Sequence, residues 1–253
     1  MWRYAGHMMD KAKSRAKSGW RYTAIVLAIV LIGALAFYVH AGWYRHGVFH
    51  AMPAAGAGID RPAIVMLSGD MGNRVGMTPK VAARLHARGY AVVTVNSLAF
   101  FSPRRTSTEA AALIADAMHR AEALGRTDKV VLIGQSFGAD MLHAGLAELP
   151  VAERTPIRAV VLVVPGHDII FRASPIELAG FETPDALALP TAARLGWTPV
   201  TCIWGAKETD SLCPELTLPN VRKVPLPGGH RLNFDDAALA AVILSAIAPA
   251  RSS

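Results

Sequence analysis

Short apolar runs alternate with helix-like stretches over most of the chain, and this alternation restricts the fold more than any other feature. The runs are rich in Val, Ile and Leu and occupy residues 63–67, 91–96, 129–134, 158–164 and 199–204, and a sixth strand is expected at 221–226. Runs that are apolar on both faces and separated by helices indicate a parallel sheet covered on both sides. The sequence therefore predicts an α/β fold with a mostly parallel sheet.

Helices are expected around these strands, at residues 77–88, 106–125, 137–149 and 235–247. We expect Thr108 to open the second of these helices. Residues 166–197 have only weak periodicity, which predicts loops or short helices that cover the site. Because no internal repeat or later boundary is visible, residues 61–253 are expected to form one domain.

Residues 23–39 form an uncharged run without proline, TAIVLAIVLIGALAFYV. When the run is extended to residue 43, it approaches the ~20 residues that a membrane-spanning helix needs. Six basic residues and one acidic residue give residues 1–22 a net charge of +5, out of +7 for the whole chain. By the positive-inside rule, residues 1–22 form a cytoplasmic basic segment, residues 23–43 span the membrane and the body is exported.

A cleaved signal peptide is the alternative to a membrane anchor, because Val39-x-Ala41 fits the small-residue rule for cleavage. Both interpretations export the body. Residues 44–60 are rich in Gly and Ala and are expected to form a flexible linker.

Charge and motif content exclude several classes of function. Outside residues 1–22 the net charge is only +2, whereas nucleic-acid binding requires a basic face on the domain itself. The sequence has neither G-x-G-x-x-G nor G-K-[ST], the glycine-rich patterns that bind phosphates. Two cysteines are too few for a four-ligand zinc site, and the sequence has no cluster of metal ligands. We therefore expect no nucleic-acid partner, no metal and no cofactor.

The segment Gly134-Gln135-Ser136-Phe137-Gly138 is a G-x-S-x-G motif between an expected strand and an expected helix. This setting is typical of a nucleophile elbow, a sharp turn that raises the serine above the edge of the sheet. Small flanking residues are required there, because a Cβ would collide with neighbouring backbone. The motif predicts Ser136 as a nucleophile and the N–H of Phe137 as a donor to an oxyanion. A plain tight turn is the alternative.

A serine nucleophile needs a base, and the base needs an orienting carboxylate. Both follow the serine along the chain in proteins with a nucleophile elbow. His230 lies just after the last expected strand and is the predicted base, with His167 as the competitor. Among the possible acids, Asp210 is preferred, Glu208 comes second and Asp168 third.

The second oxyanion donor is expected in the turn after the first strand of the body, Ser68-Gly69-Asp70-Met71-Gly72, where we assign it to Asp70. The glycines of this turn permit close approach of backbone to a carbonyl oxygen. An ordinary glycine turn is the alternative.

Cys202 and Cys213 bracket the preferred acid candidates. In an exported protein such a pair predicts a disulfide, which would fix the loop that carries Asp210. A loop of this size gains ~2–3 kcal/mol of stability in the chain-entropy model. Two buried free thiols are the alternative.

Several segments together resemble the AcvB/VirJ family of bacterial virulence factors. They are LSGD (67–70), NSLAFFSPRRT (96–106), GQSFGAD (134–140), the CIWG and E-x-D-x-x-C stretches within 202–213, and PGGH (227–230). The resemblance spans roughly residues 62–248. It implies an α/β-hydrolase fold in the periplasm. Together with the predicted membrane span of residues 23–43, this places the chain in the bacterial inner membrane with the domain on the periplasmic side. The resemblance also implies Ser136, Asp210 and His230 as the catalytic triad.

The resemblance implies a substrate class as well. AcvB-like members hydrolyse aminoacylated phospholipid, notably lysyl-phosphatidylglycerol, whereas VirJ-like members are associated with periplasmic secretion machinery. For a lysyl head group, we expect Asp70, Asp140 and Glu208 to attract the ammonium groups, although Asp140 capping or pairing within the core is an equal alternative. The functional alternatives are an esterase for another small ester and a non-enzymatic binding or secretion-associated factor of the same fold.

Overall fold

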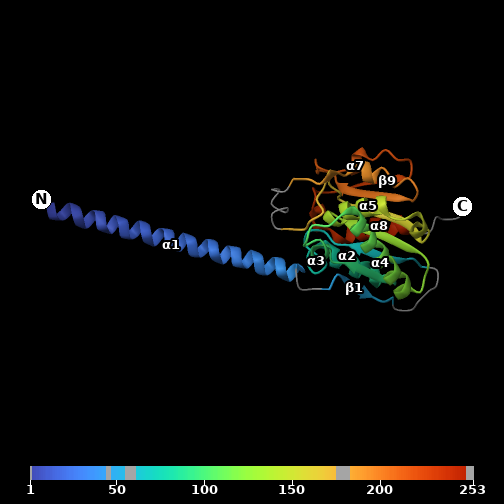
Figure 1. Cartoon of the computed structure of the whole chain (residues 1–253), viewed down its shortest axis with the longest axis horizontal. Coiled ribbons are helices and arrows are strands. Elements are labelled where there is room, and N and C mark those ends of the chain that lie inside the picture. Colours follow the sequence, from blue (N-terminus) through green and yellow to red (C-terminus); the bar gives the residue numbers. More distant parts are fainter. Residues whose placement is uncertain (1, 44–46, 55–60, 175–182, 249–253) are drawn as a thin grey trace. The chain divides into compact units, whose positions relative to one another are not determined.

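The computed structural model of the chain describes residues 2–43, 47–54, 61–174 and 183–248 (Figure 1). The chain divides into two compact units, Met1–His40 and Ala41–Ser253.

The first unit is a single long helix, α1 (Trp2–Ala41), which runs to the start of the second unit. Within it, the 22-residue segment Trp20–Ala41 contains an 18-residue stretch with a mean hydropathy of 2.5, and the segment is long and apolar enough to cross a membrane. The expected apolar helix is therefore confirmed, with bounds close to the predicted 23–43. A signal sequence has the same length and composition, so the choice between an anchor and a cleaved signal stays a prediction.

The second unit is built on a seven-stranded sheet with the order β1-β3-β2-β4-β5-β8-β9. Its strands are β1 (Phe49–Met52), β2 (Ala63–Leu67), β3 (Val92–Val95), β4 (Val130–Gln135), β5 (Ile157–Val163), β8 (Val200–Gly205) and β9 (Val221–Leu226). All neighbours pair in parallel except β1, which is antiparallel to β3. This confirms the predicted α/β fold, and each predicted strand lies within one residue of its observed bounds.

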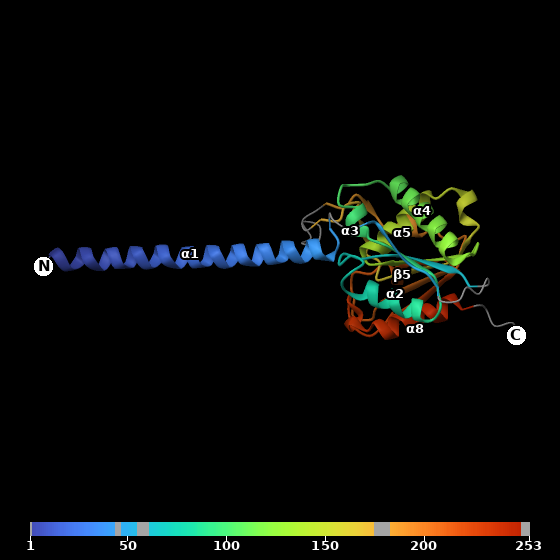
Figure 2. The same ribbon diagram turned by 90° about the horizontal axis from the view of Figure 1, so that it is seen from below.

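Helices cover both faces of the sheet, which explains why its central strands are apolar throughout. Helices α2 (Met77–Ala87) and α8 (Asp236–Ile247) pack together on one face, and α4 (Ser107–Gly125) and α5 (Phe137–Glu148) pack together on the other (Figure 2). Every residue of β2 and β3 is buried. Strand β9 lies at an edge and is half exposed, a position that tolerates Pro225.

The start of α4 differs from the prediction. Thr106, rather than Thr108, is the N-cap: its hydroxyl accepts a hydrogen bond from the N–H of Glu109, and the Glu109 side chain accepts one from the N–H of Thr106. This capping box satisfies two backbone donors at once, which a cap at Thr108 would not.

The predicted linker contains a strand. Phe49–Met52 pairs with Val92–Val95 as β1, so residues 44–60 are not a simple spacer. The strand has four residues and is only partly buried, and its sequence, FHAM, lacks the β-branched residues that marked the other strands. The rest of the predicted linker includes residues 44–46 and 55–60, which lie outside the described residues.

Short elements complete the second unit. They are α3 (Ser97–Phe100), the two-stranded pair β6 (Asp168–Ile169) and β7 (Ala186–Leu187), α7 (Leu189–Ala192), and the 3-10 turns η1 (Val151–Arg154), η2 (Cys213–Glu215) and η3 (Leu232–Phe234). The elements between residues 166 and 197 agree with the expected short structure there, apart from residues 175–182, which the description does not include.

The parallel strands end at the same edge of the sheet. The turns that follow β2, β4, β8 and β9 therefore converge, although more than one hundred and fifty residues separate the first from the last. These turns carry Asp70, Ser136, Glu208 and His230, and they form the candidate site.

Candidate active site

Ser136 is the single residue between strand β4 and helix α5. Its backbone has φ 51° and ψ −126°, a conformation that non-glycine residues rarely adopt. Its N–H donates to the carbonyl of Val163 (2.8 Å), and its carbonyl accepts from the N–H of Ala139 (2.6 Å). The strand and the helix thus hold the strained turn from both sides.

The two glycines of the motif are required by space rather than by backbone angle. A Cβ on Gly134 would lie 2.5 Å from the carbonyl oxygen of Gly138, and a Cβ on Gly138 would lie 2.5 Å from the carbonyl oxygen of Ser68. Real Cβ atoms do not approach backbone so closely, so any larger residue would push the helix away from the sheet. The predicted strand–turn–helix geometry is confirmed.

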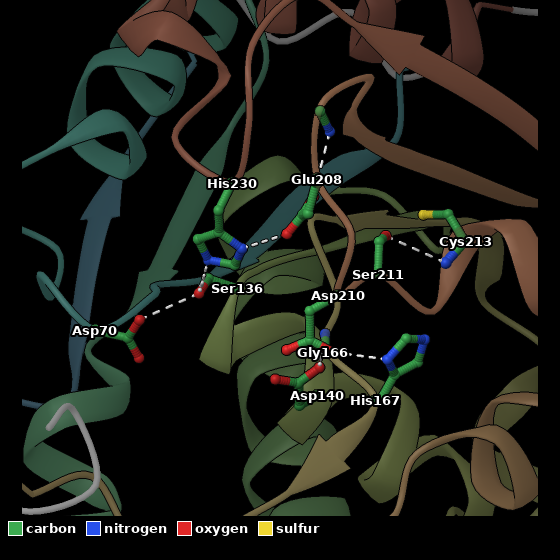
Figure 3. A network of polar contacts seen from close by, with 11 residues as sticks. Asp70, Ser136, Asp140, Gly166, His167, Glu208, Asp210, Ser211, Cys213 and His230 are labelled. Atoms are coloured by element: carbon green, nitrogen blue, oxygen red, sulfur yellow. Dashed lines mark hydrogen bonds and ion pairs between the residues drawn. The ribbon is translucent and has the colours of Figure 1, made fainter. Parts of the chain in front are cut away.

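The Ser136 hydroxyl lies within hydrogen-bonding distance of the predicted histidine. Its Oγ is 2.8 Å from Nε2 of His230 (Figure 3). The other ring nitrogen, Nδ1, is 2.5 Å from Oε1 of Glu208. A hydroxyl, an imidazole and a carboxylate therefore lie in line, as in a nucleophile–base–acid triad.

The carboxylate that contacts Nδ1 of His230 is that of Glu208. The preference for Asp210 as the acid of the triad was therefore wrong, because Asp210 does not reach His230. The Glu208 side chain is 4% exposed, whereas the Asp210 side chain is 79% exposed and contacts a different histidine, His167. Asp168, the third choice, lies in the exposed end of β6. Glu208 was also expected to bind substrate, but its two oxygens are taken by His230 and by the N–H of Gly205 (3.3 Å).

Hydrogen bonds beyond the ends of β8 and β9 explain why Glu208 reaches the histidine. The N–H of Ala206 donates to Leu226, and the N–H of Lys207 donates to Gly228, both at 2.8 Å, so the two turns stay paired after the strands end. A Cβ on Gly205 would lie 2.2 Å from the carbonyl oxygen of Gly229. The absence of a side chain at Gly205 thus permits this close approach.

His167 forms a second acid–histidine cluster nearby. Its Nδ1 is 2.6 Å from Oδ1 of Asp210, and its Nε2 is 2.9 Å from Oε1 of Glu215. Figure 3 shows this pair beside the Ser136 group but turned away from the serine. His167, the sequence-level competitor of His230, is therefore not placed to act on Ser136.

The side chain of Asp70 contacts the nucleophile, whereas the oxyanion role of its N–H stays a prediction. Its Oδ2 is 3.1 Å from Oγ of Ser136, and Figure 3 shows it on the opposite side of the serine from Glu208. Burial raises the pKa of the Asp70 carboxyl, against the lowering effects of the Ser136 hydrogen bond and the charge of His230. The sequence suggested Asp70 for its N–H and its charge but did not indicate this contact with the nucleophile.

Phe137 begins α5, so its N–H lies in the first turn of a helix, where backbone donors have no intrahelical partner. That position agrees with the predicted oxyanion role, which remains a prediction. Gly69 lies against the same turn: a Cβ there would be 3.0 Å from the carbonyl oxygen of Gln135 and 3.3 Å from the Cβ of Ser136.

Asp140 is not brought to the nucleophile. Its Oδ1 accepts a hydrogen bond from the N–H of Gly166 (3.0 Å) and is 3.8 Å from Nε2 of the fully buried His143. The carboxylate therefore holds the turn that follows β5, which is the core-pairing alternative to the predicted substrate contact. Burial lowers the pKa of His143 to about 3, so the ring is neutral at ordinary pH.

A cavity of about 300 Å³ opens beside Ser136. Polar groups of Asp70, Gln135, Ser136, His230 and Arg231 line part of it. The apolar part of the wall comes from Met71, Val75, Met77, Val164 and Phe234. Met71 belongs to the turn that the sequence placed at the site, but Val75, Met77, Val164 and Phe234 were not identified, because nothing in their local pattern distinguishes a cavity wall from core.

The predicted disulfide is present between Cys202 and Cys213. It joins the interior of β8 to η2, with both cysteines fully buried. The closed loop carries both Glu208 and Asp210, so the bridge limits the positions that either carboxylate can adopt.

The contact with Glu208 determines the protonation behaviour of His230. The hydrogen bond to this carboxylate raises the pKa of His230, while burial lowers it to a smaller extent. The Nδ1–H is fixed toward Glu208, so Nε2 presents its lone pair to Ser136 when the ring is neutral. Among the residues that the structure describes, no three His, Cys, Asp or Glu side chains gather as a metal site requires.

Several solved structures have a similar fold. A putative thioesterase from Silicibacter sp. TM1040 has a TM-score of 0.56 at 21% identity, with 79% of each chain covered. Est1E from Butyrivibrio proteoclasticus has a TM-score of 0.56 at 14% identity, covering 79% of this chain and 94% of that one. The α/β hydrolase GrgF from Penicillium sp. sh18 has a TM-score of 0.60 at 14% identity, covering 78% and 91%. The fold is therefore that of the α/β hydrolases.

The match to a known sequence family lies in the second unit. Residues 61–251 match the family described as bacterial virulence protein VirJ. The chain belongs to this family, which confirms the resemblance drawn from the motifs. A search of curated proteins found no match.

Proposed function

We propose that the protein is a serine hydrolase in which Ser136 is the nucleophile, His230 the general base and Glu208 the orienting acid. The observation that carries this proposal is the pair of contacts at His230, 2.8 Å to Ser136 and 2.5 Å to Glu208. The esterase and thioesterase names of proteins with this fold support the same class of reaction.

The proposed reaction proceeds in two halves. Ser136 Oγ attacks the ester carbonyl carbon while its proton moves to Nε2 of His230, and the carbonyl oxygen becomes an oxyanion near the N–H of Phe137. His230 then gives the proton to the leaving alcohol oxygen as the ester C–O bond breaks, which leaves an acyl-enzyme. A water molecule attacks this acyl group and loses a proton to His230. The proton returns to Ser136 Oγ as the acid departs.

Glu208 stabilises the imidazolium ion that forms in each half. Its carboxylate is nearly buried and fixed by the N–H of Gly205, so water screens it less than it screens the exposed carboxylate of Asp210. It also holds the tautomer of His230 that can accept the serine proton. This is the role that an acid has in a Ser-His-Asp or Ser-His-Glu site.

The proposed substrate is an aminoacylated phospholipid such as lysyl-phosphatidylglycerol. The apolar helix Trp20–Ala41, which would keep the site near a lipid surface, supports this choice, as does the resemblance of the motifs to AcvB-like members. Aminoacyl esters are activated toward acyl transfer. The cavity beside Ser136 combines apolar wall residues with the charged groups of Asp70 and Arg231, as an amphiphilic ester requires.

We place the second unit in the bacterial periplasm, anchored in the inner membrane by residues 23–43. Two observations support this location. Basic residues precede the apolar helix, and Cys202 is paired with Cys213, as is usual in an oxidising compartment. Protease treatment of spheroplasts tests it: the second unit should be digested in intact spheroplasts, and protection of that unit would refute the export.

The test of the activity uses the full-length chain in detergent micelles with labelled lysyl-phosphatidylglycerol. Lysine release by the wild type and none by Ser136→Ala is the expected result. Undiminished release by the variant would refute the role of Ser136. Hydrolysis of a short-chain chromogenic ester without release of lysine would keep the hydrolase and replace the substrate. No labelling of Ser136 by a fluorophosphonate would favour a non-enzymatic factor.

A further inference from the structure

The Ser136 hydroxyl has one hydrogen and two acceptors. Nε2 of His230 lies at 2.8 Å on one side and Oδ2 of Asp70 at 3.1 Å on the other (Figure 3). During catalysis the hydrogen must go to His230, because only a base can carry it to the leaving group. The Asp70 carboxyl is then left against the nucleophile without the hydrogen bond that it has in the resting site.

When Asp70 is ionised, its charge opposes the hydrolysis of an ester whose acyl group carries no positive charge. The oxyanion of the tetrahedral intermediate forms on the carbon bonded to Ser136 Oγ, so two negative charges would lie close together in a partly desolvated site. A fatty acyl or acetyl group offers nothing that offsets this repulsion. When Asp70 is ionised, a positive charge on the substrate near the scissile carbonyl would offset this repulsion.

An α-amino ester supplies that charge at the required distance. Its α-nitrogen is separated from the carbonyl carbon by a single carbon atom, so an ammonium on that nitrogen lies next to the atom that Ser136 attacks. Asp70 also lines the cavity beside the serine, on the side away from Glu208. A substrate ammonium placed there can donate to Oδ2 of Asp70 while His230 keeps its contact with the serine.

We propose that Asp70 is the subsite for the α-ammonium group of an aminoacyl ester and is thereby a specificity-determining residue that excludes fatty acyl esters. This inference rests on the proposed serine-hydrolase function and makes it more specific, because it assigns one residue to one part of the acyl group. Burial of the carboxyl, which raises its pKa, adds to the need for a cation when it is ionised.

The test compares two esters of the same alcohol that differ in one group, an alanyl ester and the corresponding lactyl ester, with the full-length chain in detergent. We expect the wild type to prefer the alanyl ester in kcat/KM by about 10- to 100-fold, the usual range for a hydrogen bond to a charged group. In Asp70→Asn the preference should fall toward unity. The fall in preference should come mainly from a lower kcat/KM for the alanyl ester, whereas kcat/KM for the lactyl ester should be unchanged or higher.

Asp210→Asn is the matched control. It removes one negative charge that also acts on His230, but Asp210 does not line the cavity. The control should keep the wild-type preference for the alanyl ester. If Asp210→Asn lowers the preference as much as Asp70→Asn does, the effect is one of total charge and the proposed subsite is wrong.

Labelling of Ser136 by a neutral fluorophosphonate separates this inference from the function on which it rests. If the wild type neither labels nor cleaves either ester, the proposed function fails. If it cleaves both esters equally, or if Asp70→Asn keeps the preference, the function stands and the subsite fails. If both Asp70→Asn and Asp70→Ala fold, by circular dichroism, but no longer label, Asp70 serves the nucleophile itself and the inference is overturned.

Discussion

Two histidine–carboxylate pairs lie at the same edge of the sheet, and the surroundings of each carboxylate distinguish them. His230 faces Glu208, whose side chain is 4% exposed, and its second nitrogen faces Ser136. His167 faces Asp210, whose side chain is 79% exposed, and its second nitrogen faces another carboxylate, Glu215. Only the first pair combines a buried acid with a nucleophile.

The comparison shows that an acid next to a histidine is not sufficient for a triad. An exposed ion pair is weakened by water and salt, whereas a buried and hydrogen-bonded carboxylate keeps its effect on the ring. Each pair joins different turns: the first ties the ends of β8 and β9, and the second ties the turn after β5 to the disulfide loop. We assign catalysis to the first pair and a structural role to the second.

The largest expected difference between the pairs comes from removing each histidine. His230→Ala should lower kcat for ester hydrolysis by on the order of 10⁴-fold or more, because it removes the imidazole that takes the Ser136 proton and carries it to the leaving group in the proposed mechanism. His167→Ala should change kcat by less than about threefold. Steady-state kinetics on a chromogenic ester measures both, and a greater loss in His167→Ala would reverse the assignment.

Replacing the buried acid should have the next largest effect. Glu208→Gln keeps the shape but removes the charge that stabilises the imidazolium ion, so kcat should fall by about 10³- to 10⁴-fold. KM should change little, since Glu208 is directed at His230 and Gly205 rather than into the cavity. A loss confined to KM would mean that Glu208 binds substrate after all.

The disulfide supports both pairs, because its loop carries both Glu208 and Asp210. Replacing Cys202 and Cys213 by serine should lower the free energy of unfolding by about 3 kcal/mol. Urea denaturation with and without reductant measures this: reductant should destabilise the wild type and leave the double variant unchanged. A variant as stable as the oxidised wild type would show that the loop is held by its other contacts.

The pH dependence of activity should separate the two histidines. In the proposed mechanism the neutral form of His230 is the base, and Glu208 raises the pKa of His230. The activity of the wild type should therefore fall on acidification at a pH above the ordinary histidine value, near 6.5. In Glu208→Gln, the acidic limb of the residual activity should move to lower pH. If the acidic limb moves in His167→Ala and not in Glu208→Gln, the titrating residue is His167, and the proposed role of His230 is contradicted.

The smallest effect is expected at the exposed acid. Asp210→Asn should leave kcat/KM within about threefold of the wild type and change stability by less than about 1 kcal/mol, because exposed ion pairs contribute little. A small decrease in the pKa of His230 should accompany it, since the Asp210 charge contributes to raising that pKa. Kinetics and urea denaturation of the same preparation check both expectations.

Much of the fold could be predicted because its strands are buried on both faces. Continuous apolar runs such as Ala63–Leu67 have no other stable place in a soluble domain, and the glycines of the elbow follow from the lack of space around Ser136. Strand β1 was missed because it is short, partly exposed and held by pairing with β3 rather than by its own pattern.

The site was harder to predict where the role of a residue depends on the orientation of its side chain. Glu208 and Asp210 are two residues apart in one turn, and the sequence does not show which side chain points inward. That choice depends on the turn made by the N–H of Glu208 with Gly205 and on the pairing of Lys207 with Gly228. Likewise, Asp140 lies one helical turn from Ser136 but bonds Gly166, a partner from a distant segment.

The most direct test of the central claim is the rate at which a fluorophosphonate labels Ser136, because it requires no knowledge of the substrate. Three proteins are compared: the wild type, Glu208→Gln and Asp210→Asn. We expect rapid labelling of the wild type and of Asp210→Asn, and labelling at least about 100-fold slower in Glu208→Gln. Slow labelling of Asp210→Asn with rapid labelling of Glu208→Gln, or no labelling of the wild type, would contradict the Ser136–His230–Glu208 assignment.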